Sequence, residues 1–159
     1  MRYRQGGASE ANIRVGTVPS AEKRRQMARV RTRNTGAEIL VRRDMHSLGL
    51  RFRLHRQNLP GRPDIVLPGH HLAVFVHGCF WHGCSKCDRG MRRPKTNAEF
   101  WSAKLTENRN RDQRNVSALE NLGWQVAVIW ECEARDPLRL AAALDGLHRS
   151  VRGNLQDDL

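Results

Sequence analysis

The sequence predicts a single-domain α/β protein, because of its length and its alternation of two apolar patterns. The chain has 159 residues, of which 39% are hydrophobic, and this is enough for one core. Short apolar runs typical of buried strands alternate with longer segments in which apolar residues recur at helical spacing. We expect a folded domain over residues 20–152, between a basic, flexible arm of residues 1–19 and a tail of residues 153–159.

Helices are expected over about residues 20–30, 35–48, 97–122 and 140–151. Ser20 can cap the first helix, and a capping-box pattern from Thr35 to Glu38 opens the second, which Gly49 ends. The second helix has its apolar positions at Ile39, Leu40, Met45 and Leu48. The last helix has them at Leu140, Ala141, Leu144, Leu147 and Val151.

Three apolar runs are expected to be strands, over residues 64–67, 72–77 and 124–130. The first two are joined by a turn at residues 68–71, so we expect a hairpin in which Asp64 faces Phe75. Asp64 and His77 would then be diagonal neighbours on one face, about 7 to 8 Å apart. A register slip of one residue would instead send them to opposite faces. In the first register a carboxylate and an imidazole share a pocket, where Asp64 and a backbone carbonyl would suit Mg²⁺.

The run from His77 to Cys87, HGCFWHGCSKC, concentrates metal-binding and stacking side chains directly after a strand. The chain has four cysteines in all, Cys79, Cys84, Cys87 and Cys132. Four thiolates complete a tetrahedral zinc site, which is structural because no coordination position stays open for water. His77 or His82 could also replace a cysteine as a ligand.

Two disulfides are the alternative for the four cysteines, and they require an oxidising compartment. The N-terminal segment lacks the apolar stretch of a signal peptide, and no run approaches 18 apolar residues. We therefore expect a cytoplasmic protein without a membrane segment, which favours zinc.

The chain is strongly basic, with a formal net charge of +12. The basic clusters lie at residues 23–25, 42–43, 51–53, 89–95 and 109–111. Nucleic acid is the expected partner, and Arg92 and Arg93 are expected to contact DNA phosphates. A solvated basic surface or binding to anionic lipid is the alternative, but no basic amphipathic helix with exposed aromatic residues is evident.

Several motifs together resemble the very short patch repair (Vsr) mismatch endonucleases. They are residues 35–38, 60–64, 75–82, 100–101, 108, 111–112, 122–124 and 130–132. The resemblance covers about residues 20–135 and implies a restriction-endonuclease-like fold, a mixed sheet flanked by helices. It also implies an enzyme that nicks one strand of double-stranded DNA 5′ to the thymine of a T:G mismatch.

The resemblance implies roles for individual residues. Asp64 would hold Mg²⁺ together with the Val76 carbonyl, and His82 would activate the attacking water, with His77 and Glu38 supporting the site. Phe80, Trp81 and Trp101 would enter the base stack, and Cys79, Cys84, Cys87 and Cys132 would bind zinc. The expected reaction leaves a 5′-phosphate without a covalent intermediate. We expect a monomer, with repair proteins as further candidate partners.

The sequence departs from the family pattern at two places. Val76 stands where threonine is frequent, so any role of that hydroxyl is lost while a carbonyl ligand remains. Cys84 stands where a histidine can occur, with one extra residue before Cys87. Metal binding is expected to persist, but the orientation of this loop relative to bound DNA could differ.

Simpler explanations exist for most of these residues. Glu38 could act only in the capping box, His77 could be an ordinary strand-end histidine, and His82 a zinc ligand or a surface residue. Asp64 could be solvated, and Trp101 could belong to the core. Asn108 and Asp112 interrupt the apolar stripe of the third helix and indicate a polar network without an assigned role. Two rival functions remain: a catalytically silent, zinc-stabilised DNA-binding module, and a nuclease with another specificity.

Overall fold

The computed structural model describes residues 21–22, 25 and 33–153. Its longer helices are α2 (Gly36–Ser47), α5 (Ala98–Asn121) and α7 (Pro137–Gly153). Its short helices are η1 (Pro68–His70), α3 (Cys79–His82), α4 (Asp88–Met91) and α6 (Glu131–Ala134). Its strands are β1 (Arg53–Leu54), β2 (Ile65–Leu67), β3 (Leu72–His77) and β4 (Gln125–Trp130).

The strands form one mixed sheet in the order β1-β2-β3-β4. The hairpin has the expected register, since Leu67 pairs with Leu72 and Ile65 with Val74 in antiparallel β2 and β3. β4 runs parallel to β3, because α5 carries the chain back to the end of the sheet at which β3 begins. In this pairing His77 lies opposite Trp130. Both parallel strands therefore end at the same edge, where their following residues can meet.

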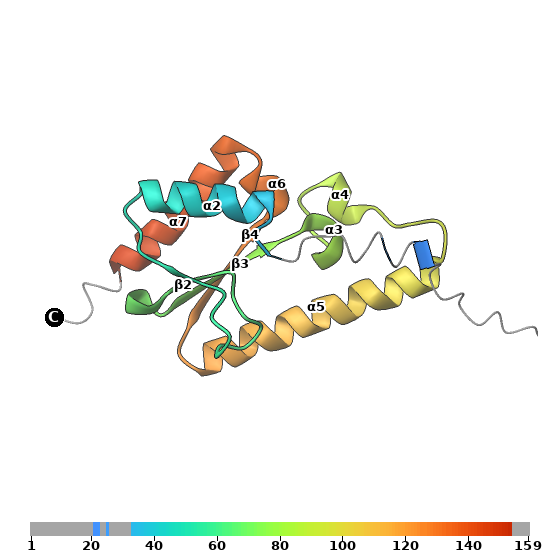
Figure 1. Ribbon diagram of the computed structural model, residues 1–159, viewed down its shortest axis with the longest axis horizontal. Helices are drawn as coiled ribbons and strands as arrows, with labels where there is room; N and C mark the ends of the chain where they lie inside the picture. Colours follow the sequence, from blue (N-terminus) through green and yellow to red (C-terminus); the bar gives the residue numbers. More distant parts are fainter. Residues whose placement is uncertain (1–20, 23–24, 26–32, 154–159) are drawn as a thin grey trace, which may run out of the picture.

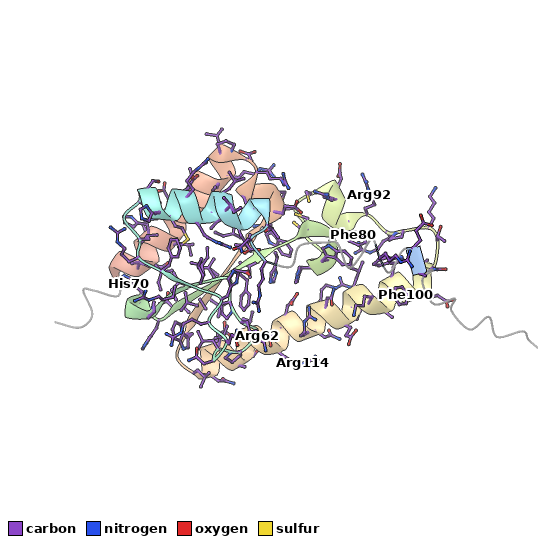
Figure 2. The ribbon with its side chains drawn as sticks, viewed as in Figure 1. Arg62, His70, Phe80, Arg92, Phe100 and Arg114 are labelled. Carbon is purple, nitrogen blue, oxygen red and sulfur yellow. The ribbon has the colours of Figure 1, made fainter. Side chains whose placement is uncertain are left out.

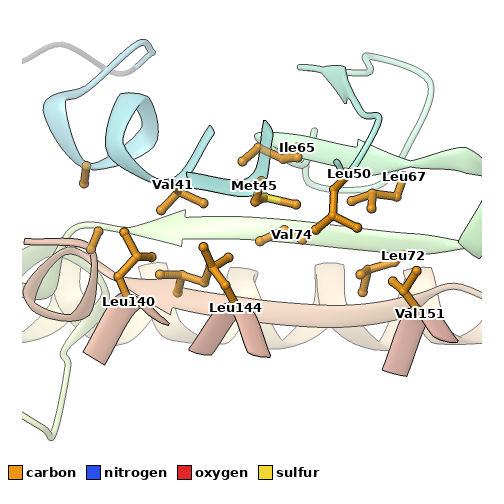
Figure 3. Close-up of a cluster of buried hydrophobic side chains, with 13 residues drawn as sticks. Val41, Met45, Leu50, Ile65, Leu67, Leu72, Val74, Leu140, Leu144 and Val151 are labelled. Atoms are coloured by element: carbon orange, nitrogen blue, oxygen red, sulfur yellow. The ribbon is translucent and has the colours of Figure 1, made fainter. Parts of the chain in front are cut away.

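Helices cover both faces of the sheet, with α2, α6 and α7 on one side and the C-terminal half of α5 on the other (Figure 1). Alternate strand residues point to opposite faces. Ile65, Leu67 and Val74 thus join the larger apolar cluster with Met45 and Leu144 (Figure 3). The other face is covered by a smaller cluster of Leu59, Val66, Ala73, Phe75 and Leu119. This arrangement confirms the predicted α/β class with a mixed sheet flanked by helices.

The N-terminal half of α5 extends beyond the sheet, and the short helices α3 and α4 lie near it (Figure 1). α3 contacts both α4 and α5. This projecting end contains the whole of the HGCFWHGCSKC run except its first two residues, which lie at the end of β3 and just after it.

Most expected elements are confirmed, with corrections in detail. The capping box of α2 is formed, but Ile39 is 52% and Leu48 is 41% exposed, whereas Val41 is buried. The buried face follows Ala37, Val41 and Met45 at four-residue spacing, which the choice of apolar positions missed. Ala141 of α7 is likewise exposed. β1 and the short helices were not predicted.

The expected arm, most of the first helix and most of the tail lie outside the described residues. Of the helices that are described, none is long and apolar enough to cross a membrane.

Candidate active site and cysteine centre

A single helical turn distributes the chemistry of the HGCFWHGCSKC run. α3 begins directly after β3 at Cys79 and ends at His82, where Gly83, at φ +68°, reverses the chain. Cys79 and His82 are three residues apart and so lie on neighbouring sides of the turn, away from Phe80 and Trp81. One side of α3 therefore contributes to the cysteine cluster and the next to a cavity. Phe80 and Trp81 form part of an aromatic cluster, and Trp81 also lines the cavity.

The cavity, of about 1170 Å³, lies between the start of α2, the start of β2, the end of β3 and one face of α5. Asp64 and His77 both line it, as the hairpin register predicts. Two groups of candidate metal-binding side chains border it, Glu38 with His55 and Asp64, and His77 with His82 and Asp112. The arginines that line it are Arg33, Arg62, Arg89, Arg111 and Arg135.

His82 is held by a carboxylate. Its Nδ1 lies 2.5 Å from Oδ2 of Asp112 on α5. When Nδ1 donates its proton to that carboxylate, Nε2 is left with the free lone pair of a base. Burial alone would raise the pKa of Asp112, but the hydrogen bond and the nearby His82, His77 and Arg111 lower it, so this carboxyl stays ionised. The pair gives Asp112 the role that the sequence left unassigned, and it disfavours His82 as a zinc ligand.

His77 is buried and packs face to face on His82, with the ring centroids 4.0 Å apart and the planes 11° from parallel. Burial lowers the pKa of His77 to about 4, and His82 and Arg111 act in the same direction against the opposing effect of Asp112. His77 is therefore neutral near pH 7, and it fixes the plane of the His82 ring by stacking.

Asp64 lies at the other end of the cavity. Its Oδ2 accepts a 2.8 Å hydrogen bond from the Val76 amide, which leaves Oδ1 without a hydrogen bond from the described part of the chain. Burial raises the pKa of Asp64 against this hydrogen bond, and the neighbouring Glu38 raises it further. A half-buried carboxylate with a raised pKa is stabilised by a bound cation.

Glu38 is already occupied by hydrogen bonds. Oε1 accepts from the Thr35 amide at 3.3 Å and from the Thr35 hydroxyl at 3.0 Å. Oε2 accepts from the Asn34 amide at 3.0 Å and from Arg42 at 2.5 Å. The capping box predicted from the sequence therefore accounts for this buried carboxylate, and Glu38 can reach the chemistry only through its charge beside Asp64.

His55 is a site residue that the sequence analysis missed. Its backbone has φ +47°, a left-handed conformation that is uncommon outside glycine, and its amide donates to the Asp64 carbonyl at 3.2 Å. Its Nε2 is buried with no hydrogen-bond partner in the described structure, 3.9 Å from Oε2 of Glu38. His55 follows the short strand β1 and has no spacing signature, so only the folded loop brings it to the carboxylates.

The four cysteines converge on one point. All four are free, and their sulfur atoms lie within 4.8 Å of one another, with 3.8 Å between Cys84 and Cys132. A tetrahedron of thiolates at 2.3 Å from zinc has edges of about 3.8 Å, so the donor set fits that metal. Burial raises the pKa of Cys79 and of Cys132, so a cation is needed to hold the group as thiolates. One cluster of free thiols is not the arrangement of two disulfides.

The cysteine cluster is held by contacts around it. The Cys132 amide donates to Sγ of Cys79, and the Lys86 amide to Sγ of Cys84, each at 3.3 Å. Two ion pairs tie the loop to α6 on either side of Cys132, Lys86 to Glu133 at 2.6 Å and Arg89 to Glu131 at 3.1 Å.

Gly90 lies directly against the loop that carries the cysteines. A Cβ at this position would lie 2.0 Å from the Cys84 carbonyl oxygen. Only glycine fits here without a shift of the backbone.

Phe80, Trp81 and Trp101 form a partly exposed aromatic cluster at the projecting end. Their ring centroids are 5.2 to 5.9 Å apart, and Phe100 extends the cluster by a 5.5 Å contact with Trp101. None of these four rings belongs to either apolar cluster of the sheet, which argues against a core role for Trp101. Buried Asn108 donates to the Trp81 carbonyl at 3.1 Å, so α5 holds α3 through Asn108 as well as Asp112.

Arg92 and Arg93 are exposed, and Figure 2 shows Arg92 on the same projecting end of the molecule as Phe80 and Phe100. Arg93 also donates to the Gly90 and Arg92 carbonyls, at 2.9 and 3.1 Å. Its guanidinium is therefore partly used within the loop, whereas the Arg92 guanidinium makes no hydrogen bond with the residues that the structure describes.

A carboxylate-held imidazole, a half-buried carboxylate and several arginines around one cavity are groups that can hydrolyse a phosphodiester, so the site is compatible with a nuclease. Comparison with known proteins agrees. Residues 17–89 match the family described as DNA mismatch endonuclease Vsr. The type II nicking enzyme V.XorIIP of Xanthomonas oryzae is 52% identical over 126 residues, which is 79% of this chain and 91% of the relative.

Two further relatives are similar over most of the chain. The type II nicking enzyme V.NmeAIP of Neisseria meningitidis is 39% identical, over 79% of this chain and 89% of the relative. The DNA mismatch endonuclease Vsr of Escherichia coli is 39% identical, over 72% of each chain. The chain belongs to the Vsr family, and it is a DNA nicking endonuclease.

Proposed function

We propose that this endonuclease nicks one strand of double-stranded DNA 5′ to the thymine of a T:G mismatch, by hydrolysis with His82 as general base. The observation that carries the proposal is the His82–Asp112 pair facing the same cavity as Asp64. Action on mismatched DNA is supported by the E. coli relative, a DNA mismatch endonuclease, and the choice of T:G among mismatches rests on the resemblance of the sequence motifs to the Vsr family. The mixed sheet is compatible with the restriction-endonuclease-like fold that this proposal includes.

His82 removes the proton from the attacking water. Asp112 accepts from Nδ1, so Nε2 takes the proton and the resulting imidazolium is stabilised by the carboxylate. His77 stacks on the ring and limits its rotation. The hydrolysis then needs no nucleophilic side chain and leaves a 5′-phosphate.

Asp64 is the residue that would hold Mg²⁺ in the cavity, because Oδ1 is free to bind and burial makes the carboxylate require a cation. The Val76 carbonyl is the proposed second ligand, from the residue whose amide already orients Asp64. A bound Mg²⁺ would supply Lewis-acid stabilisation of the charge on the phosphate. The donors at this end of the cavity are hard oxygens, with His55 beside them.

Cys79, Cys84, Cys87 and Cys132 are proposed to hold a structural zinc. Closed four-thiolate coordination leaves no position for water, so these residues fix α3 and take no part in hydrolysis. Phe80, Trp81 and Trp101, held at this end, are proposed to enter the base stack beside the mismatch. A mismatched step costs less to open than a paired one, which favours the lesion before any base edge is read.

The first experiment measures single-turnover nicking of matched, T:G and other mismatched duplexes, with and without Mg²⁺. Preferential nicking of T:G duplexes only with Mg²⁺ is the expected result. Equal nicking of every mismatch would indicate another lesion specificity, and binding without nicking would indicate a silent DNA-binding module.

Variants test the assigned residues. His82→Ala and Asp64→Asn should each slow nicking by about 10²-fold or more while mismatch binding is largely kept, because both act on the reaction. Full activity in Asp64→Asn would contradict the metal site.

Trp81→Ala should reduce the preference for mismatched over matched DNA more than Phe80→Ala does. The double variant Arg92→Gln, Arg93→Gln should instead weaken binding to both duplexes alike.

A further inference from the structure

Five residues of α5 line the cavity at helical spacing, Asn108, Arg111, Asp112, Asn115 and Val116. Two of them have clear structural partners, since Asn108 donates to the Trp81 carbonyl and Asp112 pairs with His82. Arg111 belongs to the same face of the helix. It is exposed to solvent at the cavity rather than buried in the protein.

Two other arginines of the cavity wall form ion pairs with a glutamate. Arg89 and Arg135 both pair with Glu131, each at 3.1 Å. Arg111 has no ion pair or hydrogen bond with the residues that the structure describes, although its charge acts on both His77 and Asp112. An unpaired guanidinium beside the candidate base is available to an anion that enters the cavity.

The reaction places such an anion there. A water activated by His82 attacks the phosphorus from about 3 to 3.5 Å, so the phosphate being cut must lie next to the imidazole. Negative charge builds up on the nonbridging oxygens during attack. A donor already in position therefore stabilises the transition state more than it stabilises the ground state. Arg33 and Arg62 also line the cavity, but neither acts on His77 or Asp112 as Arg111 does.

We infer that Arg111 is a further catalytic residue of this endonuclease, which contacts a nonbridging oxygen of the phosphate being cut and stabilises the charge that develops there. The inference rests on the proposed role of His82 for the position of the phosphate. It does not depend on the T:G preference or on the metal.

The test compares Arg111→Gln and Arg111→Lys with Arg114→Gln. Arg114 is an exposed arginine of the same helix that does not line the cavity (Figure 2). Exposed positions of this kind change stability little, so all three variants should fold. Single-turnover nicking of whichever duplex the wild type cuts should slow by about 10²-fold in Arg111→Gln, recover in part in Arg111→Lys, and stay within about twofold in Arg114→Gln.

A binding measurement supplies a readout that is independent of turnover. The nicked linkage is mapped with the wild type, and duplexes are then made with either a normal phosphate or an uncharged methylphosphonate at that linkage. Without added Mg²⁺, the neutral linkage should weaken binding of the wild type and of Arg114→Gln by about tenfold, as loss of a charged hydrogen bond does. Arg111→Gln should bind both duplexes equally.

Two results would overturn the inference. One is a nicking rate in Arg111→Gln within twofold of the wild type. The other is an undiminished sensitivity of Arg111→Gln to the neutral linkage. Failure of the proposed function has a different signature, namely full nicking in His82→Ala or no preference for T:G, and neither result changes the comparison of the two linkages.

Discussion

The two halves of α5 show two different ways of holding a helix in place. The C-terminal half packs on the sheet, where Leu119 is fully buried in an apolar cluster. The N-terminal half projects beyond the sheet and is partnered by α3. The cysteine cluster, a partly exposed aromatic cluster and two hydrogen bonds hold α3, one that Asn108 donates to the Trp81 carbonyl and one that Asp112 accepts from His82. Burial against the sheet stabilises the C-terminal half. The N-terminal half buries Leu105 outside the two apolar clusters of the sheet, and specific polar bonds and a proposed metal add to its stability.

Under the proposed function, the difference between the two halves has a reason. Aromatic side chains that are to enter a base stack must stay partly exposed, so they cannot be buried in a core of their own. A metal site supplies local rigidity from four side chains without covering the rings. The projecting end is therefore expected to be rigid yet exposed, and each of the following predictions separates it from the sheet.

The largest effect is expected from Cys132→Ser. Loss of this ligand should remove the zinc, about one per chain in the wild type, and loosen α3 and α4 while the sheet stays folded. Zinc analysis and hydrogen exchange of residues 79–91 against residues 65–77 measure this, with Ser85→Ala in the same loop as the control. Equal loss of protection in both segments would show that the two regions unfold as one.

Gly90→Ala should destabilise the protein by about 2 kcal/mol or more, because the added Cβ meets the Cys84 backbone and forces it to move. The matched control is Gly146→Ala in α7, where nothing lies within 4 Å of an added Cβ. Alanine there should stabilise the helix by about 0.5 to 1 kcal/mol. Urea unfolding measures the free energy of unfolding of both variants, which should be lower than that of the wild type in Gly90→Ala and higher in Gly146→Ala.

Because of His77, the free energy of unfolding should fall by about 2 kcal/mol when the pH is lowered from roughly 7.5 to 5. Its pKa is lowered to about 4 in the folded protein, below its unfolded value, so the unfolded chain binds the additional proton. Stability is therefore full above the unfolded pKa and falls as the pH drops toward 4. Chemical denaturation of wild type and His77→Gln at the two pH values tests this, since the variant should lose less stability on acidification.

Asp64→Asn should raise the Tm of the metal-free protein at neutral pH by a few degrees, the smallest of these effects. The folded-state pKa of Asp64 is raised, so the ionised carboxylate opposes folding at pH values above its unfolded pKa, and asparagine can still accept from Val76. Added Mg²⁺ should stabilise the wild type and not the variant. A lower Tm in Asp64→Asn would indicate that the carboxylate is stabilising without a cation.

The sequence was most informative where local patterns decide the structure. The capping box of α2, the hairpin register from Leu67 to Leu72, and the long helix α5 follow from spacing and turn residues, and all are confirmed. The clustering of the four cysteines could also be predicted, because three of them lie in one segment and Cys132, the last one in the chain, completes a four-thiolate metal site. These signals depend on neighbours in the chain.

The missed features depend on distant parts of the chain. His55 reaches Glu38 and Asp64 only through a left-handed turn after β1, and no residue pattern announces it. Asp112 meets His82 across 30 positions, so the stripe of α5 revealed a polar interruption without showing its partner. The exposure of Ile39 and Leu48 arises because the buried face of α2 is set by the sheet and α7 rather than by hydrophobicity alone.

The parallel pairing of β3 with β4 also has a consequence for the order in which the four cysteines come together during folding. Cys79, Cys84 and Cys87 lie within one short segment, but Cys132 reaches them only when β4 has docked beside β3 and brought His77 opposite Trp130. During folding, three thiols can therefore meet a metal early, and the fourth arrives last, after the longest loop has closed. Under the zinc proposal, tight metal binding marks a finished sheet, and the aromatic cluster is rigid only in chains that have completed it.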